Sequence, residues 1–257
     1  AVMILNAIHD NGGQNIISAA LENSRIDFSS EGSFCRELIA WVWEGKTPDS
    51  QGTYERYWHG YLVILKPLLL VMDYADIRIL NMITHILLMG ILIMSMTEYR
   101  LKRCVVPFLL CYAILNPVAI CMSMQFSSVY YIFIIASLFL IRYNREIQKR
   151  QWDGYVFLII GIVTSYFDYL TYPIATLGIP VIFAYHLFDT ELNLKGQIMQ
   201  LVKRCFYWGI GYACMWCSKW VLASAVLKRN ILRQAKSHID MHTDSAVVMD
   251  EVLSAWD

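Results

Sequence analysis

The sequence predicts an all-α protein: a polytopic bundle of about six transmembrane helices plus a re-entrant or interfacial helix, preceded by a partly helical N-terminal extracytoplasmic loop. Composition is the first reason, because 57% of the residues are hydrophobic and only 16% are charged, whereas about a quarter of a soluble domain is charged. The second reason is that the apolar residues form long blocks, as lipid-spanning helices require. The third is that Lys and Arg gather in alternate connections between these blocks.

Residues 1–56 are polar and mixed, and we expect them to form the extracytoplasmic loop region. The stretches "AVMILNAIHD", "NIISAALEN" and "CRELIAWVWEG" each have short helical periodicity, and "TPDSQG" is typical of a loop. The chain opens without an initiator Met and closes on "VVMDEVLSAWD", which resembles the middle of a helix. We therefore expect a fragment of a longer protein.

Residues 57–76 are predicted to be a juxtamembrane or re-entrant segment. The run "YWHGYLVILKPLLLVMDY" is apolar but contains His59, Lys66 and Pro67. Its uninterrupted part is too short for a full span, so an interfacial helix is favoured over a short kinked span. The helix bundle then covers 77–227, and the predicted spans are 77–97, 104–124, 127–142, 154–170, 173–188 and 205–227.

The distribution of charge predicts the orientation. Three connections, "EYRLKR", "IRYNREIQKRQ" and "LNLKGQIMQLVKR", carry ten bases, and the alternate connections "QFSS" and "FDYLTYP" carry none. The ten are Arg100, Lys102, Arg103, Arg142, Arg145, Lys149, Arg150, Lys195, Lys203 and Arg204. Basic loops stay in the cytoplasm, so we expect a multi-pass plasma-membrane protein with residues 1–76 and the tail 228–257 on the outside.

The tail departs from this pattern, because "LKRNILRQAKSH" adds four bases, including Arg233, on the predicted outer side. Either the topology differs by one span or the bases have a role there. Positive charge at a membrane surface attracts an anionic headgroup or a lipid-linked phosphate. A solvated helix face is the plain alternative.

The stretch "SYFDYLTYP" (165–173) places one carboxylate, Asp168, among tyrosines at the outer end of a span. A carboxylate near membrane depth is costly and usually functional. Tyr166, Tyr169 and Tyr172 are typical of an interfacial aromatic belt, and tyrosines also stack on sugar rings. The alternative is an interfacial turn with a hydrated Asp168.

The stretch "YERYWHGYLVILKP" (54–67) is the second concentration of reactive side chains. Glu55 or His59 suits a general base, and Arg56 suits a phosphate clamp because its guanidinium presents a fork of donors. Tyr57 and Trp58 suit a sugar platform. A belt of aromatic rings with snorkelling charges is the alternative.

Two further features need an explanation. Asp73 and Asp76 precede the first clear span, where they either pair with Arg78 or bind a divalent cation together with a substrate pyrophosphate. Lys219 lies within the last apolar block, where it either snorkels to an interface or faces a polar cavity together with Asp168.

Several motifs are absent. The sequence has no Walker A motif, GxGxxG, GxSxG, HExxH, heptad or internal repeat, which disfavours ATPases, Rossmann enzymes and the common hydrolases. Nothing in it favours nucleic acid as a partner.

The stretches "RYWHGYLVILKPLLLVMDYADIRILN" and "SYFDYLTYPIATLGIP" resemble polytopic membrane proteins of Gram-positive and gut bacteria whose architecture is similar to that of GT-C glycosyltransferases. The resemblance covers about residues 1–235. It implies a large outer loop with helices along the membrane, a carboxylate as base or metal ligand, and a polyprenyl-phosphate sugar held by basic residues. The chain departs from this pattern by lacking the first span and the start of the loop, where a catalytic Asp is common.

From these residues and this resemblance we expect a transferase that moves a sugar from a lipid-phosphate donor to a cell-envelope glycan. Asp168, Glu55 and His59 are the expected catalytic residues, and a divalent cation is a weaker expectation. The expected substrate-binding residues are Arg56, Tyr57, Trp58, Tyr169, Tyr172, Lys219 and Arg233. A flippase of lipid-linked saccharides and a non-catalytic membrane subunit are the alternatives. The transferase and the flippase hypotheses both require Glu55, His59, Asp168 and Lys219 to converge on one outward-facing cavity.

Overall fold

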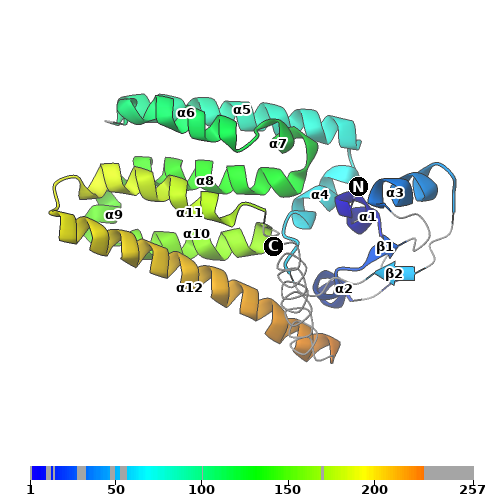
Figure 1. The fold of residues 1–257 in the computed structure, drawn as a ribbon. Coiled ribbons are helices and arrows are strands. Elements are labelled where there is room, and N and C mark those ends of the chain that lie inside the picture. The colour runs from blue at the N-terminus through cyan, green and yellow to red at the C-terminus, as the bar shows by residue number, and fades with distance from the viewer. Residues whose placement is uncertain are drawn as a thin grey trace, which may run out of the picture.

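The computed structural model describes residues 2–9, 13, 15–27, 33–46, 50–52, 57–99, 101–168 and 171–228. These residues form a helical protein with two parts, a small N-terminal region at one end of a longer helix bundle (Figure 1). The N-terminal region contains helices α1 (Val2–Ile8), α2 (Ile16–Glu22) and α3 (Phe34–Val42). Strands β1 (Arg25–Asp27) and β2 (Ser50–Gly52) pair antiparallel beside them.

Helix α4 (Leu62–Leu69) connects this region to the bundle, and α5 (Tyr74–Glu98) begins the bundle. A 3-10 turn, η1 (Lys102–Cys104), leads into α6 (Val105–Ile114) and α7 (Val118–Met122). The bundle continues with α8 (Met124–Arg142), α9 (Asn144–Arg150) and α10 (Asp153–Phe167). It ends with α11 (Pro173–Ala184), the π-helical turn η2 (Tyr185–Asp189) and α12 (Leu194–Leu227).

Three of these helices, α5, α8 and α12, are long and apolar enough to cross a membrane. Helix α10 and the continuous α11–η2 segment are apolar but shorter. The expectation of a helical bundle is thus confirmed, and three of its helices are able to cross a membrane. The predicted span 104–124 is not one helix, because the chain breaks between α6 and α7 at Asn116, which has a left-handed backbone (φ 60°), and Pro117. Proline has no backbone N–H to donate within a helix, so a helix rarely continues through it.

Helix α12 differs most from its predicted bounds, since it begins at Leu194 rather than near residue 205. Its 34 residues make a helix about 51 Å long, which exceeds the roughly 30 Å hydrocarbon core of a bilayer. Its C-terminal part extends past the bundle and contacts α2 (Figure 1).

Helices α10 and α12 pack with their backbones in close contact. A Cβ on Gly161 would lie 2.1 Å from the Trp208 carbonyl oxygen, and a Cβ on Gly211 would lie 2.1 Å from the Leu158 carbonyl oxygen. Only glycine fits at these two positions, as is common where membrane helices approach closely. This contact fixes α12 against α10 and so determines where the end of α12 lies.

Candidate functional site

The segment that precedes α4 lies against the last turn of α10. The Gly60 N–H donates to the Tyr166 carbonyl at 3.0 Å, and a Cβ on Gly60 would lie 2.6 Å from the Tyr166 ring. The rings of Trp58 and Tyr166 are 5.5 Å apart. The two stretches that the sequence singled out therefore meet here, and glycine is needed at position 60 for that approach.

Helix α12 completes this junction. The Trp58 indole N–H donates to the Met215 carbonyl at 2.9 Å, and the Tyr57 ring stacks on the Trp216 ring at 5.8 Å. We call residues 57–60, Tyr166 and the Met215–Lys219 turn of α12 the interfacial junction.

Lys219 is fully buried in this junction. Its ammonium group donates to the carbonyls of Ala20 at 3.1 Å and Leu21 at 2.8 Å, and it lies 4.8 Å from the centre of the Trp58 ring. Carbonyls at the end of a helix lack helical partners and carry partial negative charge. Lys219 therefore attaches the last turn of α2 to α12.

His59 is held in one tautomer. Its Nδ1 lies 3.1 Å from the Tyr57 carbonyl oxygen, which can only accept, so Nδ1 carries the proton and the lone pair of the neutral ring is on Nε2. The pKa of His59 is lowered to about 3, mainly by burial; the Tyr57 hydrogen bond opposes this in part, and the charge of Lys219 makes a smaller contribution in the same direction as burial. At pH 7 the ring is neutral.

Asp168 follows α10 directly and is only 2% exposed. Its Oδ1 accepts from the Thr171 N–H at 3.0 Å, the local bond by which an aspartate shapes a turn. It stands two residues after Tyr166 in the sequence. Asp168 thus lies close to the junction, but it lines neither of the two cavities described below.

A cavity of about 430 Å³ opens beside the junction. One wall consists of Trp58, His59 and Gly60 together with Tyr166, and α4 contributes Lys66. The opposite wall comes from the N-terminal region and includes Asn6, Ala19, Ala20, Asn23 and Ser24. We call this space the junction cavity. It lies within the size range of small-molecule sites.

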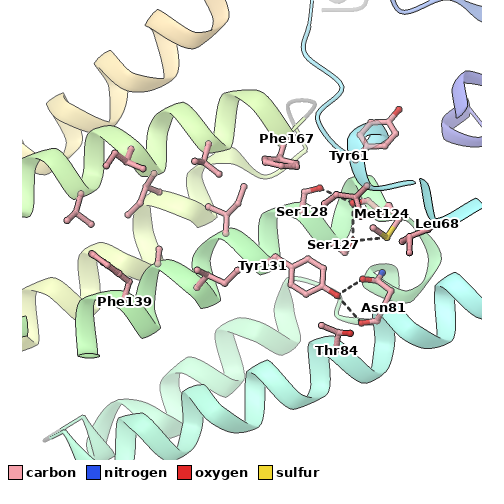
Figure 2. A pocket seen from close by; sticks show the side chains of 18 of the residues that line it. Tyr61, Leu68, Asn81, Thr84, Met124, Ser127, Ser128, Tyr131, Phe139 and Phe167 are labelled. Carbon is pink, nitrogen blue, oxygen red and sulfur yellow. Dashed lines mark hydrogen bonds between the residues drawn. The ribbon is translucent and has the colours of Figure 1, made fainter. Parts of the chain in front are cut away.

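A second, larger space of about 850 Å³ lies between α5, α8 and α10 (Figure 2). Its walls are almost entirely apolar, and its polar groups, apart from Trp152 and Tyr155 at the far end, lie near α4. There the Tyr131 hydroxyl donates to the Asn81 side chain at 2.6 Å, and Ser127 and Ser128 bond to the Met124 carbonyl (Figure 2). We call this space the apolar groove.

The apolar groove and the junction cavity lie on opposite sides of the same two stretches. Gly60 and Leu62 line the cavity while Tyr61 and Ile64 line the groove. Similarly, Tyr166 lines the cavity and Phe167 the groove.

The other predicted site residues are spread more widely. Tyr172 directly precedes α11, makes no capping hydrogen bond with its side chain, and is 42% exposed. Asp73 caps α5, where its Oδ1 accepts from the Asp76 N–H at 2.9 Å. Within the described ranges, no three His, Cys, Asp or Glu side chains lie close enough to hold a metal ion. Glu55, Arg56, Tyr169 and Arg233 lie outside the described residues.

Sequence reasoning missed Asn6, Asn23 and Lys66 as cavity residues. Asn6 interrupts an otherwise apolar helix and hydrogen-bonds to Tyr61, whose pKa burial raises to about 12. Asn23 ends α2 with a left-handed backbone (φ 51°). A polar residue within an apolar repeat was a usable signal for Asn6, but a terminal asparagine is common at helix ends and indicates no site.

The fold and the junction define a class of helical protein in which three helices are able to cross a membrane. Where the N-terminal region meets the bundle, the protein has a polar cavity and an apolar groove. No family model, curated protein or solved structure matches the chain. The function therefore has to be argued from the site.

Proposed function

We propose that this protein is a membrane-embedded glycosyltransferase of the GT-C type. It moves a sugar from a polyprenyl-phosphate donor to a cell-envelope glycan, and the junction cavity binds the sugar. The chemistry takes place on the outer face of a bacterial plasma membrane, on the side opposite the basic connections.

The observation that carries this proposal is the junction itself. "YWHG" and "SYFD" are more than a hundred residues apart in sequence, yet the Gly60 N–H bonds to the Tyr166 carbonyl and the two stretches share one cavity. Aromatic rings and a few convergent polar groups are typical of small-molecule sites. Of the residues expected to converge, His59 lines the cavity, and Lys219 contacts the Trp58 ring at its wall.

The apolar groove supports a lipid-linked donor. It follows α8 from Met124 to Phe139, about 22 Å along the helix axis, beside two helices that are able to cross a membrane. A hydrocarbon chain in this groove would bring its polar end toward Tyr61, next to the junction cavity. The polar side chains gather near one end of the groove, which favours a transferase over a flippase, because a flippase needs polar groups along the whole path.

The residues take the following roles. His59 lines the cavity as a neutral ring at pH 7 and does not attract phosphate by charge. Asp168 bonds to the Thr171 N–H and holds the connection that follows α10 beside the junction, and so acts as a positioning residue. Glu55 is then the preferred general base and Arg56 the preferred phosphate ligand, both argued from their sequence positions beside Tyr57.

Trp58→Leu tests the proposal against a matched control, Trp43→Leu, because Trp43 is 86% exposed on the N-terminal region. The purified protein in nanodiscs is given polyprenyl-phosphate hexose carrying a radioactive sugar, and transfer to glycan extracted from the host envelope is counted. We expect Trp58→Leu to lose at least tenfold in transfer, about 1.4 kcal/mol, and Trp43→Leu to match the wild type. Absence of transfer by the wild type from every hexose donor would contradict the proposal.

A further inference from the structure

The apolar groove has a second end, on the side of the bundle away from the junction. Phe139 of α8 and Trp152 and Tyr155 beside or on α10 line it there, and Phe139 lies at the opposite end of the groove from Asn81 (Figure 2). The last lining residue from α5 is Thr84, so α8 and α10 form the walls beyond it. We call this part the far end of the groove.

Two arginines lie beside the rings at the far end. The guanidinium carbon of Arg150 is 4.7 Å from the centre of the Trp152 ring. The guanidinium carbon of Arg142 is 5.8 Å from the centre of the Tyr143 ring, which lies 4.9 Å from the Phe139 ring. At these distances a ring attracts a cation. The contacts therefore place two positive charges next to the apolar walls of the groove.

The far end also presents hydrogen-bond donors. A guanidinium has five N–H donors in a fork that matches a phosphate group. Arg150 pairs with Glu146 through its Nε at 3.4 Å, but this pair is exposed and contributes little. Trp152 and Tyr155 add an N–H and an O–H donor, and these side chains are 47% and 58% exposed.

The connection that carries the arginines is basic. The stretch "RYNREIQKRQW" (142–152) contains four bases and one acid. Asp153 follows it, but its carboxylate already pairs with Lys203 and Arg204. An anionic group at the far end thus meets a net positive charge.

A ligand that suits the far end has to combine an anion with a hydrocarbon chain. A soluble anion would leave the apolar walls uncovered, and a neutral hydrocarbon would leave the arginines without an anionic partner. A phospholipid with an anionic headgroup offers both parts. Basic residues at one end of a membrane bundle attract such headgroups, and Trp and Tyr are enriched at the depth where headgroups lie.

We infer that the far end of the groove binds an anionic phospholipid of the bilayer. One acyl chain lies between α8 and α10, and Arg142 and Arg150 bind the phosphate. The inference goes beyond the proposed function and does not rest on it. The groove follows α8 from Met124 to Phe139 for about 22 Å, and one leaflet is about 15 Å thick, so such a lipid leaves the end beside Tyr61 open.

The test titrates lipids onto the full chain in an uncharged detergent and counts bound lipids by native mass spectrometry. The probes are dioleoyl phosphatidylglycerol, which is anionic, and dioleoyl phosphatidylcholine, which has the same chains and no net charge. Glycerol phosphate, an anion without acyl chains, and polyprenyl phosphate are added as competitors.

The test variant combines Arg142→Gln with Arg150→Gln. The matched control combines Arg145→Gln with Lys149→Gln, which removes the same charge from exposed positions of α9. Because all four side chains are exposed, the thermal unfolding midpoint of both variants without added lipid should stay within a few degrees of the wild type. This measurement separates lost binding from lost folding.

We expect the wild type and the control to bind phosphatidylglycerol about tenfold or more tightly than phosphatidylcholine, and the test variant to lose this preference. Equal binding of the two phospholipids by the wild type would overturn the inference, as would equal losses in the two variants. Full competition by glycerol phosphate would show that the groove takes no part. Tighter binding of polyprenyl phosphate that depends on Arg142 and Arg150 would assign the far end to the donor and would also overturn the inference.

Discussion

At the scale of single residues, the surroundings of Lys219 and His59 determine how each of these buried ionisable side chains is stabilised. Lys219 is fully buried, yet it faces the carbonyls of Ala20 and Leu21 and the Trp58 ring. Burial of a charge is tolerated when it is paired with such groups. The sequence identified Lys219 as costly, but its partners come from a helix about two hundred residues earlier, which no local pattern could predict.

His59 should make stability depend on pH. Its pKa is about 3 when folded and about 6.5 when unfolded, so the unfolded chain binds a proton that the folded chain does not. This contribution to stability is fully present above pH 6.5 and is lost as the pH falls toward 3. Between pH 7 and pH 5 we expect the loss to be about 1–2 kcal/mol.

The measurement is the thermal unfolding midpoint in detergent at pH 7, 6 and 5, for the wild type and His59→Gln. The variant should show a smaller decrease on acidification, because glutamine does not titrate. His186→Gln, at an exposed histidine, should keep the wild-type decrease. Parallel curves for the wild type and His59→Gln would show that His59 is not buried in its neutral form.

At the scale of elements, η2 and α12 are joined by buried charges. The Arg204 guanidinium forms two bonds with the Asp189 carboxylate, and its Nε lies 3.5 Å from Asp153. Lys203 pairs with the other oxygen of Asp153 at 2.8 Å. The sequence assigned Lys203 and Arg204 to a basic loop, but both residues lie within α12. Their ion pairs connect α12 to η2 and to the start of α10.

Asp189→Asn should destabilise the bundle by about 3–5 kcal/mol, because it leaves the buried Arg204 with only its longer contact to the Asp153 carboxylate. Glu146→Gln is the matched control, since Glu146 and Arg150 pair at 3.4 Å on an exposed helix face, where such a pair contributes about 0.5 kcal/mol or less. Chemical unfolding in mixed micelles, followed by Trp fluorescence, compares the two. Similar losses in both variants would contradict the view that burial decides the strength of this network.

At the scale of the whole molecule, charge and polarity are separated along the bundle. The N-terminal region and the junction lie at one end, and the connections from α5 to α6, from α8 through α9 to α10, and from η2 to α12 lie at the other (Figure 1). Most of the basic residues that predicted a cytoplasmic face lie in or beside the second set; Lys195, Lys203 and Arg204 belong to α12, which follows it. We expect the N-terminal region to face the outside of the cell.

Cysteine labelling tests this orientation. Cys35, exposed in the N-terminal region, is kept as the only cysteine in one variant, and Arg145→Cys in α9 is the only cysteine in another. A membrane-impermeant maleimide added to intact cells should label Cys35 and leave position 145 unlabelled until the cells are lysed. The reverse pattern would place the junction in the cytoplasm and would exclude transfer on the outer face.

The sequence by itself determined the helical fold, the apolar character of its long helices, the position of most bundle helices and the two stretches that meet at the junction. These follow from local hydrophobicity, charge and helix-breaking residues, which act over a few turns of chain. It did not determine how long α12 is or that 104–124 breaks at Asn116, because helix ends depend on packing and capping.

Only the tertiary structure decided which of the predicted residues share a cavity. Trp58, His59 and Tyr166 line one wall of the cavity, and Asn6 and Asn23 line the opposite wall. Lys219 bonds to the end of α2, and Asp168 bonds to the Thr171 N–H after α10. The physical reason is that the close contact at Gly161 and Gly211 directs the long α12 past the bundle to the N-terminal region. The site is thus built from contacts between distant segments, and those contacts depend on how the helices pack.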